Sequence, residues 1–525
     1  MSKLSDINLF RLNNNHQQNL YNSFTNNLNI IAFQLYNPIF AHYFTFYNNN
    51  SYKYFTFKSK YTLYNFSESI EPKNNDSYIK HIYKSKIRNN INKKIEDREI
   101  FIKINSILDN SQYIQNLYNI NHNNGLPNIY HNLSNKKIND SNNTAYIDGF
   151  SSFILSKLVE NNYCPSFPLY YGTFNGIIDN YKFDITEDYN SIKNISWFKK
   201  YNDNKFSIEM KDIYEFDNIV RDLLIRNNNL NTLNTMTLDN LSIETLSDDS
   251  DFKSNENSQP ENNSDVESIW TDIESNSDID STISLESIEN YKKIKYCNIK
   301  DYPVHMICME SFHDTLDNLL DNGYDMSAEE WKGILFQICF ALSVAQKHYN
   351  FIHNDLHSSN IMFEETSCEF LYYSFNKRYF KIPTFNKISK IIDFGRATFI
   401  INKRVYFSDV FKKNGDAEGQ YDYPYNGNFK YCRNRPNPSF DLARLATTIS
   451  EHFSPDDDLY SLMEEWTKDD SNLILLNEPD DFDLYRKIAE TVHNTIPKDQ
   501  LGHDIFSEFI IDKSEIPKNE TIYVF

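Results

Sequence analysis

The chain has 525 residues and a formal net charge of −21, and 40% of its residues are hydrophobic. This length leaves room for roughly two to four domains, and the apolar fraction suffices for a sizeable core. The sequence contains no run of about 18 apolar residues, so no transmembrane helix is expected. Its six cysteines include no C-x-x-C pair, which argues against a zinc site or a disulfide framework. The first residues lack the apolar core of a signal peptide, so an intracellular, by default cytoplasmic, location is expected.

Residues 1–75 are rich in asparagine and aromatic residues. Within them, residues 43–47 and 52–58 alternate in a way that predicts a β-hairpin. No pattern in this stretch points to chemistry. It is therefore predicted to be an N-terminal extension that packs on the domain after it.

A strand and a helix are predicted next. Residues 100–103 read Ile-Phe-Ile-Lys, a short apolar strand that ends in Lys103. Apolar residues recur every three or four positions over residues 144–161, which predicts an amphipathic helix. Asp148 and Glu160 are the acidic residues of that helix.

The composition changes sharply at residues 227–290. Between Asp239 and Glu289 there are 15 acidic residues and one basic residue, so most of the net charge lies here. A segment of this kind cannot bury enough apolar surface to offset the entropy of ordering it, and a disordered acidic insertion is predicted. The charge of the remaining chain is ordinary, which argues against nucleic acid as the main partner.

Two further elements lead to the most informative part of the chain. Residues 303–311 predict a strand that ends near Met309 and Glu310. Residues 327–349 predict a long helix with a continuous apolar stripe. Ser327 can cap this helix, because a glutamate stands three residues later, at the position of a capping box.

Two short motifs follow this helix. The first, residues 353–360, reads His-Asn-Asp-Leu-His-Ser-Ser-Asn, and the second, residues 391–395, reads Ile-Ile-Asp-Phe-Gly. Phosphoryl transfer to a hydroxyl needs an acceptor for the hydroxyl proton and oxygen ligands for Mg²⁺. Asp355, Asn360 and Asp393 provide these groups in the order of the patterns H-x-D-x-x-x-x-N and D-F-G.

On these motifs and the helix before them, the chain resembles the protein-kinase-like superfamily over about residues 95–450. It looks most like the divergent kinase-like proteins of large DNA viruses. The resemblance implies an α+β, bilobal fold with a small β-rich N-lobe and a larger, mainly helical C-lobe. The implied division is an N-terminal extension, an N-lobe, the acidic insertion, a last N-lobe strand with the hinge, and a C-lobe, at residues 1–75, 76–226, 227–290, 291–310 and 311–525.

The resemblance also implies roles for individual residues, with ATP and Mg²⁺ as cofactors. Asp355 would be the catalytic base, and Asn360 and Asp393 would bind magnesium. Lys103 would neutralise the phosphates of ATP, and Asp148, preferred to the other helix acid by its position, would pair with it. Three more positions are implied to contact the nucleotide: Met309, Glu310 and His357. Further on, Asp441 would brace the backbone of the catalytic loop.

The chain departs from the kinase pattern in several places. No G-x-G-x-x-G precedes Lys103, since the first glycine is Gly125. Asn354 stands where the arginine of H-R-D usually receives the activation-segment phosphate. His357 replaces a lysine that usually approaches the γ-phosphate, and histidine is only partly charged near neutral pH.

Three functions are compatible with this pattern. The first is an atypical serine/threonine protein kinase with a protein substrate, which the retained Asp355, Asn360 and Asp393 favour. The second is a small-molecule phosphotransferase of the aminoglycoside or choline kinase type, which shares H-x-D-L-H-x-x-N and a later D-L-A. The third is a pseudokinase that binds partners without catalysis, which the missing glycine-rich loop favours. None of the three calls for a membrane or nucleic-acid partner.

Overall fold

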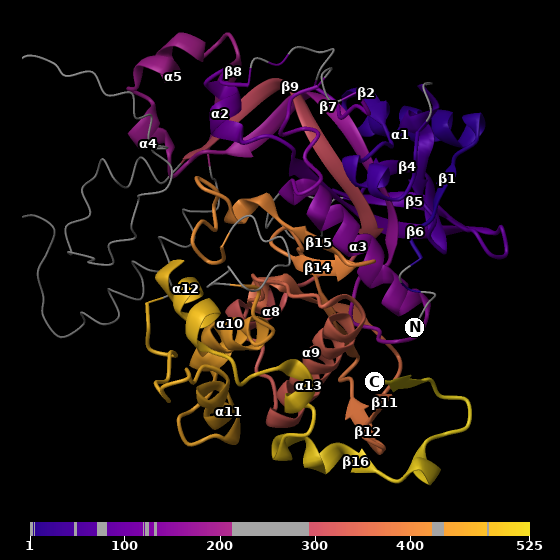
Figure 1. The fold of residues 1–525 in the computed structure, drawn as a ribbon, viewed down its shortest axis with the longest axis vertical. Coiled ribbons are helices and arrows are strands. Elements are labelled where there is room, and N and C mark those ends of the chain that lie inside the picture. The colour runs from indigo at the N-terminus through magenta and orange to yellow at the C-terminus, as the bar shows by residue number, and fades with distance from the viewer. Residues whose placement is uncertain are drawn as a thin grey trace, which may run out of the picture. The chain divides into compact units, whose positions relative to one another are not determined.

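The computed structural model describes residues 4, 6–46, 50–70, 81–118, 120, 125–130, 134–212, 293–422, 435–479 and 482–525. The predicted acidic insertion lies outside these residues, as does part of the segment that follows the second motif. The chain divides into two compact units, one formed by Met1–Tyr181 with Ile299–Phe525 and the other by Lys182–Asn298. The fold is of the mixed α+β type, with a β-rich N-terminal region (Figure 1).

The β-rich region is built on a seven-stranded sheet in the order β2-β7-β9-β6-β5-β4, with β8 paired to β9. Its strands are β2 (Ile30–Gln34), β4 (Tyr61–Ser69), β5 (Ile82–Asn89), β6 (Ile95–Ser106), β7 (Tyr170–Asp184), β8 (Phe206–Asp212) and β9 (Lys293–Glu310). The N-terminal residues belong to this sheet, because β2 and β4 both precede residue 75. The boundary expected at that residue falls between β4 and β5, which are hydrogen-bonded neighbours.

The remaining N-terminal elements are a helix on the sheet and a separate pair of short strands. Helix α1 (Asn14–Leu28) packs against β4, and β1 (Leu9–Arg11) pairs with β3 (Phe55–Phe57). The hairpin expected over residues 43–58 is absent from its described part, which has a 3-10 helix at Asn50–Tyr54 followed by β3. The aromatic side chains of this stretch pack into a cluster, as the ring of Tyr52 shows, 5.0 Å from that of Tyr36.

Helix α3 (Thr144–Glu160) confirms the helix predicted at residues 144–161. Asn143 is its N-cap, and the Asn143 side chain accepts a hydrogen bond from the backbone N–H of Ala145. The helix approaches the sheet closely at Gly149. A Cβ atom there would lie 2.5 Å from Nε2 of His305 and 2.9 Å from Cγ2 of Thr173. Glycine costs a helix interior about 1 kcal/mol relative to alanine, and here it allows this close packing.

The C-terminal part combines helices with small sheets. Helix α9 (Ala328–Tyr349) confirms the predicted long helix, and Ser327 caps it by accepting a hydrogen bond from the amide of Glu330. The other helices of this part are α8 (Leu316–Asp321), α10 (Phe440–Ile449), α11 (Asp458–Trp466), α12 (Phe482–Thr491) and α13 (Pro497–Gln500), whereas α2 (Asn110–Ile114) follows β6 in the N-terminal region. No helix of the described residues is long and apolar enough to cross a membrane.

Three small sheets complete this part. Strands β10 (Ile361–Glu365) and β13 (Lys387–Ile391) pair antiparallel and carry the two motifs at their ends. The other two sheets have the orders β16-β12-β11-β17 and β14-β15. Their strands are β11 (Phe370–Phe375), β12 (Arg378–Pro383), β14 (Thr398–Ile401), β15 (Arg404–Phe407), β16 (Ile510–Ile511) and β17 (Ile522–Val524).

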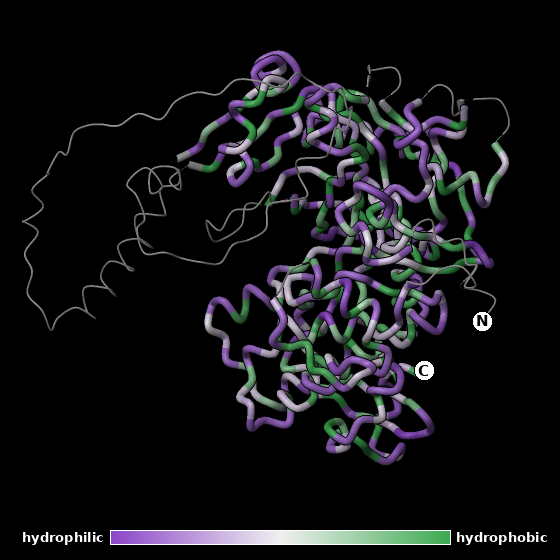
Figure 2. The backbone as a smooth tube through the Cα atoms, turned by 60° about the vertical axis from the view of Figure 1, so that its left-hand side comes forward, coloured by the Kyte–Doolittle hydropathy of each residue, from purple (hydrophilic) through white to green (hydrophobic). Residues whose placement is uncertain are grey.

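The second unit contains α4 (Tyr189–Ile192), α5 (Ser196–Tyr201) and β8, with Ile192, Phe198 and Phe206 buried among them. Hydrophobic and hydrophilic stretches alternate along the chain in both units (Figure 2), as amphipathic elements require. The residues of the predicted site all belong to the first unit.

Candidate active site

Lys103 connects the sheet to two acidic side chains. Its Nζ lies 2.7 Å from Oδ2 of Asp148 on α3 and 2.8 Å from Oδ1 of Asp393 in the D-F-G motif. Burial alone would lower the pKa of Lys103, but the two carboxylates outweigh it and raise the pKa above its usual value. The ammonium group therefore stays charged and holds a strand, a helix and the second motif together.

Asp148 is nearly fully buried and has three partners. Besides Lys103, its carboxylate accepts hydrogen bonds from Nδ2 of Asn105, at 2.8 Å, and from the backbone N–H of Phe394, at 3.1 Å. Aspartate is one methylene shorter than glutamate, and it still reaches the lysine. The residue after Asp148 is Gly149, where α3 packs closely against the sheet.

Glu160, the other acid of α3, lies elsewhere. Its carboxylate oxygens accept hydrogen bonds from the backbone N–H of Lys60, both at 3.2 Å. Burial raises the pKa of Glu160 to about 7. The structure thus brings Asp148, and not Glu160, to the predicted lysine.

Asp393 adopts a left-handed backbone conformation, with φ of 63°. Withdrawal from water would raise its pKa, but the ammonium group of Lys103 outweighs this and lowers the pKa to about 2. The side chain remains 46% exposed, and its contacts with Lys103 and with the amide of Gly395 both use Oδ1. The hydroxyl of Thr144 donates to the carbonyl oxygen of Gly395 at 2.8 Å, which ties the motif to the first turn of α3.

The loop that contains Asp355 is fixed from two sides. Buried Asp441 accepts hydrogen bonds from the amides of His353 and Asn354, each at 2.9 Å, as the resemblance implies for a brace. The ring of His353 is bonded through Nε2 to the carbonyl oxygen of Ile392 at 2.7 Å. The amide of Ile392 in turn donates to the carbonyl oxygen of Asn360 at 3.0 Å. These bonds connect the two motifs directly.

Asp355 is oriented by two side chains from outside its loop. The hydroxyl of Tyr485 on α12 donates to Oδ1 at 2.9 Å, and Nη1 of Arg396 lies 3.3 Å from the same oxygen. Sequence reasoning missed both. The position of Arg396 directly after D-F-G could have suggested it, whereas nothing in the sequence around Tyr485 connects it to a loop 130 residues away.

Asn360 and His357 contact each other. Nδ2 of Asn360 donates to the carbonyl oxygen of Asp355 at 2.9 Å and lies 3.0 Å from Nε2 of His357. An amide nitrogen can only donate, so this contact is a hydrogen bond when Nε2 carries no proton. Burial is the largest influence on the ring and lowers the pKa of His357. Oδ1 of Asn360, an oxygen of the type that Mg²⁺ prefers, takes no part in these two contacts.

Met309 and Glu310, the two residues at the end of β9 that are predicted to contact the nucleotide, have different surroundings. Met309 stands opposite Phe101 in the register of β6 and β9, on the sheet face that carries Lys103. Glu310 uses its amide to donate to the carbonyl oxygen of Leu169 at 2.9 Å, and its carboxylate to accept from the amide of Leu169 at 3.1 Å. The amide and the carboxylate of Glu310 thus fix the backbone of Leu169, the residue directly before β7.

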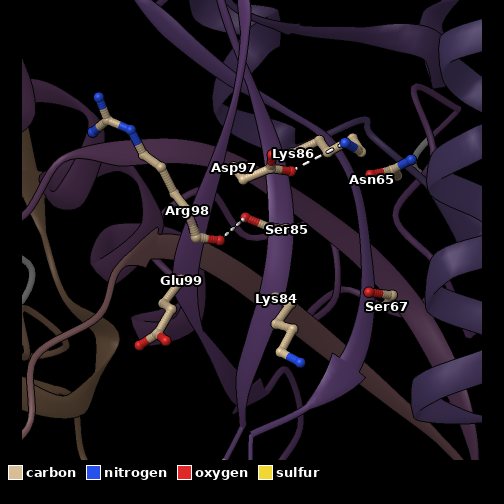
Figure 3. A pocket seen from close by; sticks show the side chains of 8 residues that line it. All are labelled: Asn65, Ser67, Lys84, Ser85, Lys86, Asp97, Arg98 and Glu99. Atoms are coloured by element: carbon tan, nitrogen blue, oxygen red, sulfur yellow. Dashed lines mark hydrogen bonds and ion pairs between the residues drawn. The ribbon is translucent and has the colours of Figure 1, made fainter.

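A cavity of about 430 Å³ lies over β4, β5 and β6 (Figure 3). Lys84 and Lys86 stand opposite Glu99 and Asp97 across β5 and β6, and Lys86 forms an ion pair with Asp97 at 3.0 Å. By strand alternation these side chains share the sheet face of Lys103. The cavity is therefore a polar extension of that face. Its walls carry both signs of charge.

The segment after D-F-G is held by uncharged hydrogen bonds at Asn354. Its Nδ2 donates to the carbonyl oxygen of Arg396 at 2.9 Å, and its Oδ1 accepts from the hydroxyl of Tyr421 at 2.9 Å. Asn354 has φ of 66°, a conformation that asparagine tolerates better than most residues. Asparagine here makes direct contacts in place of an arginine that would bind a phosphate.

The same segment is anchored to α3 by Asp409. This buried carboxylate accepts a hydrogen bond from the amide of Thr144 at 3.1 Å and forms ion pairs with Lys137 and, at 2.8 Å, with Lys412. Burial would raise the pKa of Asp409, but the two lysines outweigh it and lower the pKa. A permanent negative charge therefore stands at the N-terminus of α3, where the helix dipole favours it.

The chain shows limited similarity to known proteins. No protein-family model matches the chain. Over 42 residues the chain is 38% identical to a Dictyostelium discoideum protein described as a "probable serine/threonine-protein kinase". The matched stretch is 8% of this chain and 3% of that protein. The similarity points to a distant kinase-like relationship, in agreement with the two motifs. Within the described residues, no group of three or more histidine, cysteine, aspartate or glutamate side chains could hold a metal ion by itself.

Proposed function

We propose that this chain is an ATP- and Mg²⁺-dependent protein kinase that transfers the γ-phosphoryl group to a serine or threonine hydroxyl of a protein. The observation that carries the proposal is the convergence of both motifs with Lys103. The lysine bridges Asp148 and Asp393, while the loop of Asp355 and Asn360 is hydrogen-bonded to the residue before Asp393. We infer a bilobal arrangement of the kinase type from the same connections.

Each residue has a defined task in this proposal. Lys103 neutralises the α- and β-phosphates, and Oδ1 of Asn360 with the carboxylate of Asp393 holds the magnesium ion. The donor set suits that ion, because amide and carboxylate oxygens are its preferred protein ligands and phosphate oxygens and water complete its shell. When bound, magnesium neutralises charge on the phosphates. Asp355 accepts the proton of the acceptor hydroxyl.

The nucleotide base would lie on the sheet face of Lys103, near Met309 and Phe101. Glu310 supports this region by holding β7 in place. The connection between β4 and β5 is the counterpart of the glycine-rich loop by its position upstream of Lys103, and residues 71–80 of it lie outside the described residues. That connection contains no glycine, so it lacks the residue that lets backbone amides approach phosphates most closely.

The alternative of a small-molecule phosphotransferase draws support from His357 and from the D-L-A sequence at Asp441. The length of the segment 396–439, where kinases place a protein substrate, favours a polypeptide acceptor. The deciding experiment compares transfer from labelled ATP to casein or myelin basic protein with transfer to aminoglycosides, choline and nucleosides, with Asp355→Ala as the blank. The proposal expects labelled protein. Turnover on a small alcohol, with none on proteins, would refute the protein substrate.

A pseudokinase would bind partners through this fold without turnover, and the missing glycine-rich loop is the feature that favours it. The retained proton acceptor, Asp355, favours an enzyme, because a scaffold does not require one. Absence of transfer to every acceptor, with the wild type and Asp355→Ala equally inactive, would favour the scaffold. The kinship with kinase-like proteins of large DNA viruses remains an inference from the motifs.

A further inference from the structure

The carboxylate of Asp355 is engaged on one oxygen. The hydroxyl of Tyr485 and Nη1 of Arg396 both approach Oδ1, at 2.9 Å and 3.3 Å. The side chain of Asp355 remains 23% exposed. Oδ2 takes no part in these contacts, so an incoming hydroxyl can meet it.

Tyr485 is held firmly by its helix. Its neighbours Leu484, Ile488 and Ala489 are buried in the apolar cluster that also contains Phe440 and Tyr421. A tyrosine anchored in this way reaches the carboxylate without the loss of side-chain freedom that a surface residue would suffer.

Two guanidinium groups flank the ring of Tyr485. The Cζ atoms of Arg444 and Arg396 lie 4.6 Å and 5.5 Å from its centre, within the range of cation–π attraction. Burial, followed by the charge of Asp355, raises the pKa of Tyr485. The phenol therefore keeps its proton at neutral pH and acts as a donor to Oδ1.

The cation that kinases place in this loop is missing here. His357 stands at the position of the lysine, and histidine is only partly charged near neutral pH. Arg396 supplies a guanidinium group beside Asp355, and arginine stays charged at any pH of interest. The positive charge beside Asp355 thus comes from Arg396, and both Arg396 and Tyr485 orient its carboxylate.

We propose that Tyr485 is a positioning residue for phosphoryl transfer, which together with Arg396 fixes the carboxylate of Asp355 so that Oδ2 faces the acceptor hydroxyl. This inference rests on the proposed function. In the step, the acceptor oxygen forms a bond to the γ-phosphorus while the bond from that phosphorus to the β,γ-bridging oxygen breaks. ADP leaves with the bridging oxygen, and the hydroxyl proton passes to Oδ2 of Asp355.

Tyr485→Phe tests this role, because it removes only the hydroxyl. Loss of orientation at a reacting group lowers kcat by roughly 10- to 100-fold, and we expect the KM for ATP and the melting temperature to stay at their wild-type values. The matched control is Tyr324→Phe, since the Tyr324 hydroxyl lies 3.3 Å from both carboxylate oxygens of Glu330. The control should retain the wild-type kcat.

Asp355→Asn provides the second readout. Because Tyr485 acts through Asp355, adding Tyr485→Phe to Asp355→Asn should lower the residual kcat no further. Arg396→Met removes the other donor and should also lower kcat, which keeps the test open should Tyr485→Phe fail to fold. A Tyr485→Phe enzyme with kcat within about twofold of the wild type, or an equal loss in the Asp355→Asn background, would overturn the proposal. An inactive wild type would instead refute the proposed function.

Discussion

Replacing Asp409 with asparagine should destabilise the protein and loosen the start of α3. The substitution keeps the shape of the side chain and an oxygen that can accept from the amide of Thr144. It removes the negative charge that Lys137 and Lys412 share. We choose it because Asp409 is buried and yet joins the segment after D-F-G to the helix that carries Asp148.

The expected loss of unfolding free energy depends on how exposed Lys137 and Lys412 are. Removing one member of a fully buried ion pair costs about 3–5 kcal/mol. The side chains of Lys137 and Lys412 are 21% and 37% exposed, so water can solvate them once the carboxylate is gone. We therefore expect the free energy of unfolding to fall by about 2 kcal/mol, the range of a hydrogen bond to a charged group.

The pH dependence has a definite sign. The folded-state pKa of Asp409 is lowered, so its contribution is fully present above the unfolded-state value of about 3.9. It is lost as the pH falls through the lower folded-state value. The difference between the wild type and Asp409→Asn should thus be constant near neutral pH and shrink in strong acid.

Chemical denaturation at pH 7, repeated at acidic pH, measures this difference. Asp97→Asn is the matched control, because Asp97 pairs with Lys86 at 3.0 Å but is 85% exposed, and such surface pairs contribute about 1 kcal/mol or less. If Asp409→Asn and Asp97→Asn changed the free energy of unfolding equally, the carboxylate of Asp409 would not be the anchor described above.

Three other substitutions or treatments test neighbouring parts of the site. Gly149→Ala should push α3 away from His305 and cost about 1–3 kcal/mol, and a thermal-shift series should show weaker stabilisation by Mg·ATP; full retention of that shift would argue that the close approach does not support Asp148. Lys103→Met should abolish the shift given by Mg·ATP, and a shift equal to that of the wild type would remove the lysine from the nucleotide site. Phosphatase treatment should leave activity intact, because Asn354 and Asp409 hold the segment after D-F-G without a phosphate; loss of activity on complete dephosphorylation, checked by mass spectrometry, would contradict this.

Patterns over short stretches of sequence predicted two helices and the two motifs of the candidate site. Helices α3 and α9 were recognisable because apolar spacing of three to four residues is imposed by the helix itself. The order of Asp355, Asn360 and Asp393 was readable because each lies in a short motif. Their convergence with Lys103 is a property of the folded chain.

Long-range contacts account for what sequence reasoning did not find. Residues 43–58 alternate like a hairpin, yet their described part forms a 3-10 helix and a short strand, and Tyr52 packs against Tyr36 from outside this stretch. Strands β2 and β4 joined the main sheet instead of forming a separate extension. Tyr485 and Asp409 reach the site only through tertiary packing, and no spacing in the sequence relates either of them to it.

The most direct test of the central claim is phosphoryl transfer itself, measured with purified protein, γ-labelled ATP, Mg²⁺ and a mixture of proteins. The account predicts labelled protein with the wild type and none with Asp355→Ala or Asp393→Ala. Asp355→Ala should still be stabilised by Mg·ATP in a thermal-shift series, because the lysine and the two magnesium ligands remain. Transfer that persists undiminished in Asp393→Ala, or that is absent from the wild type with every acceptor, would contradict the assignment of this site.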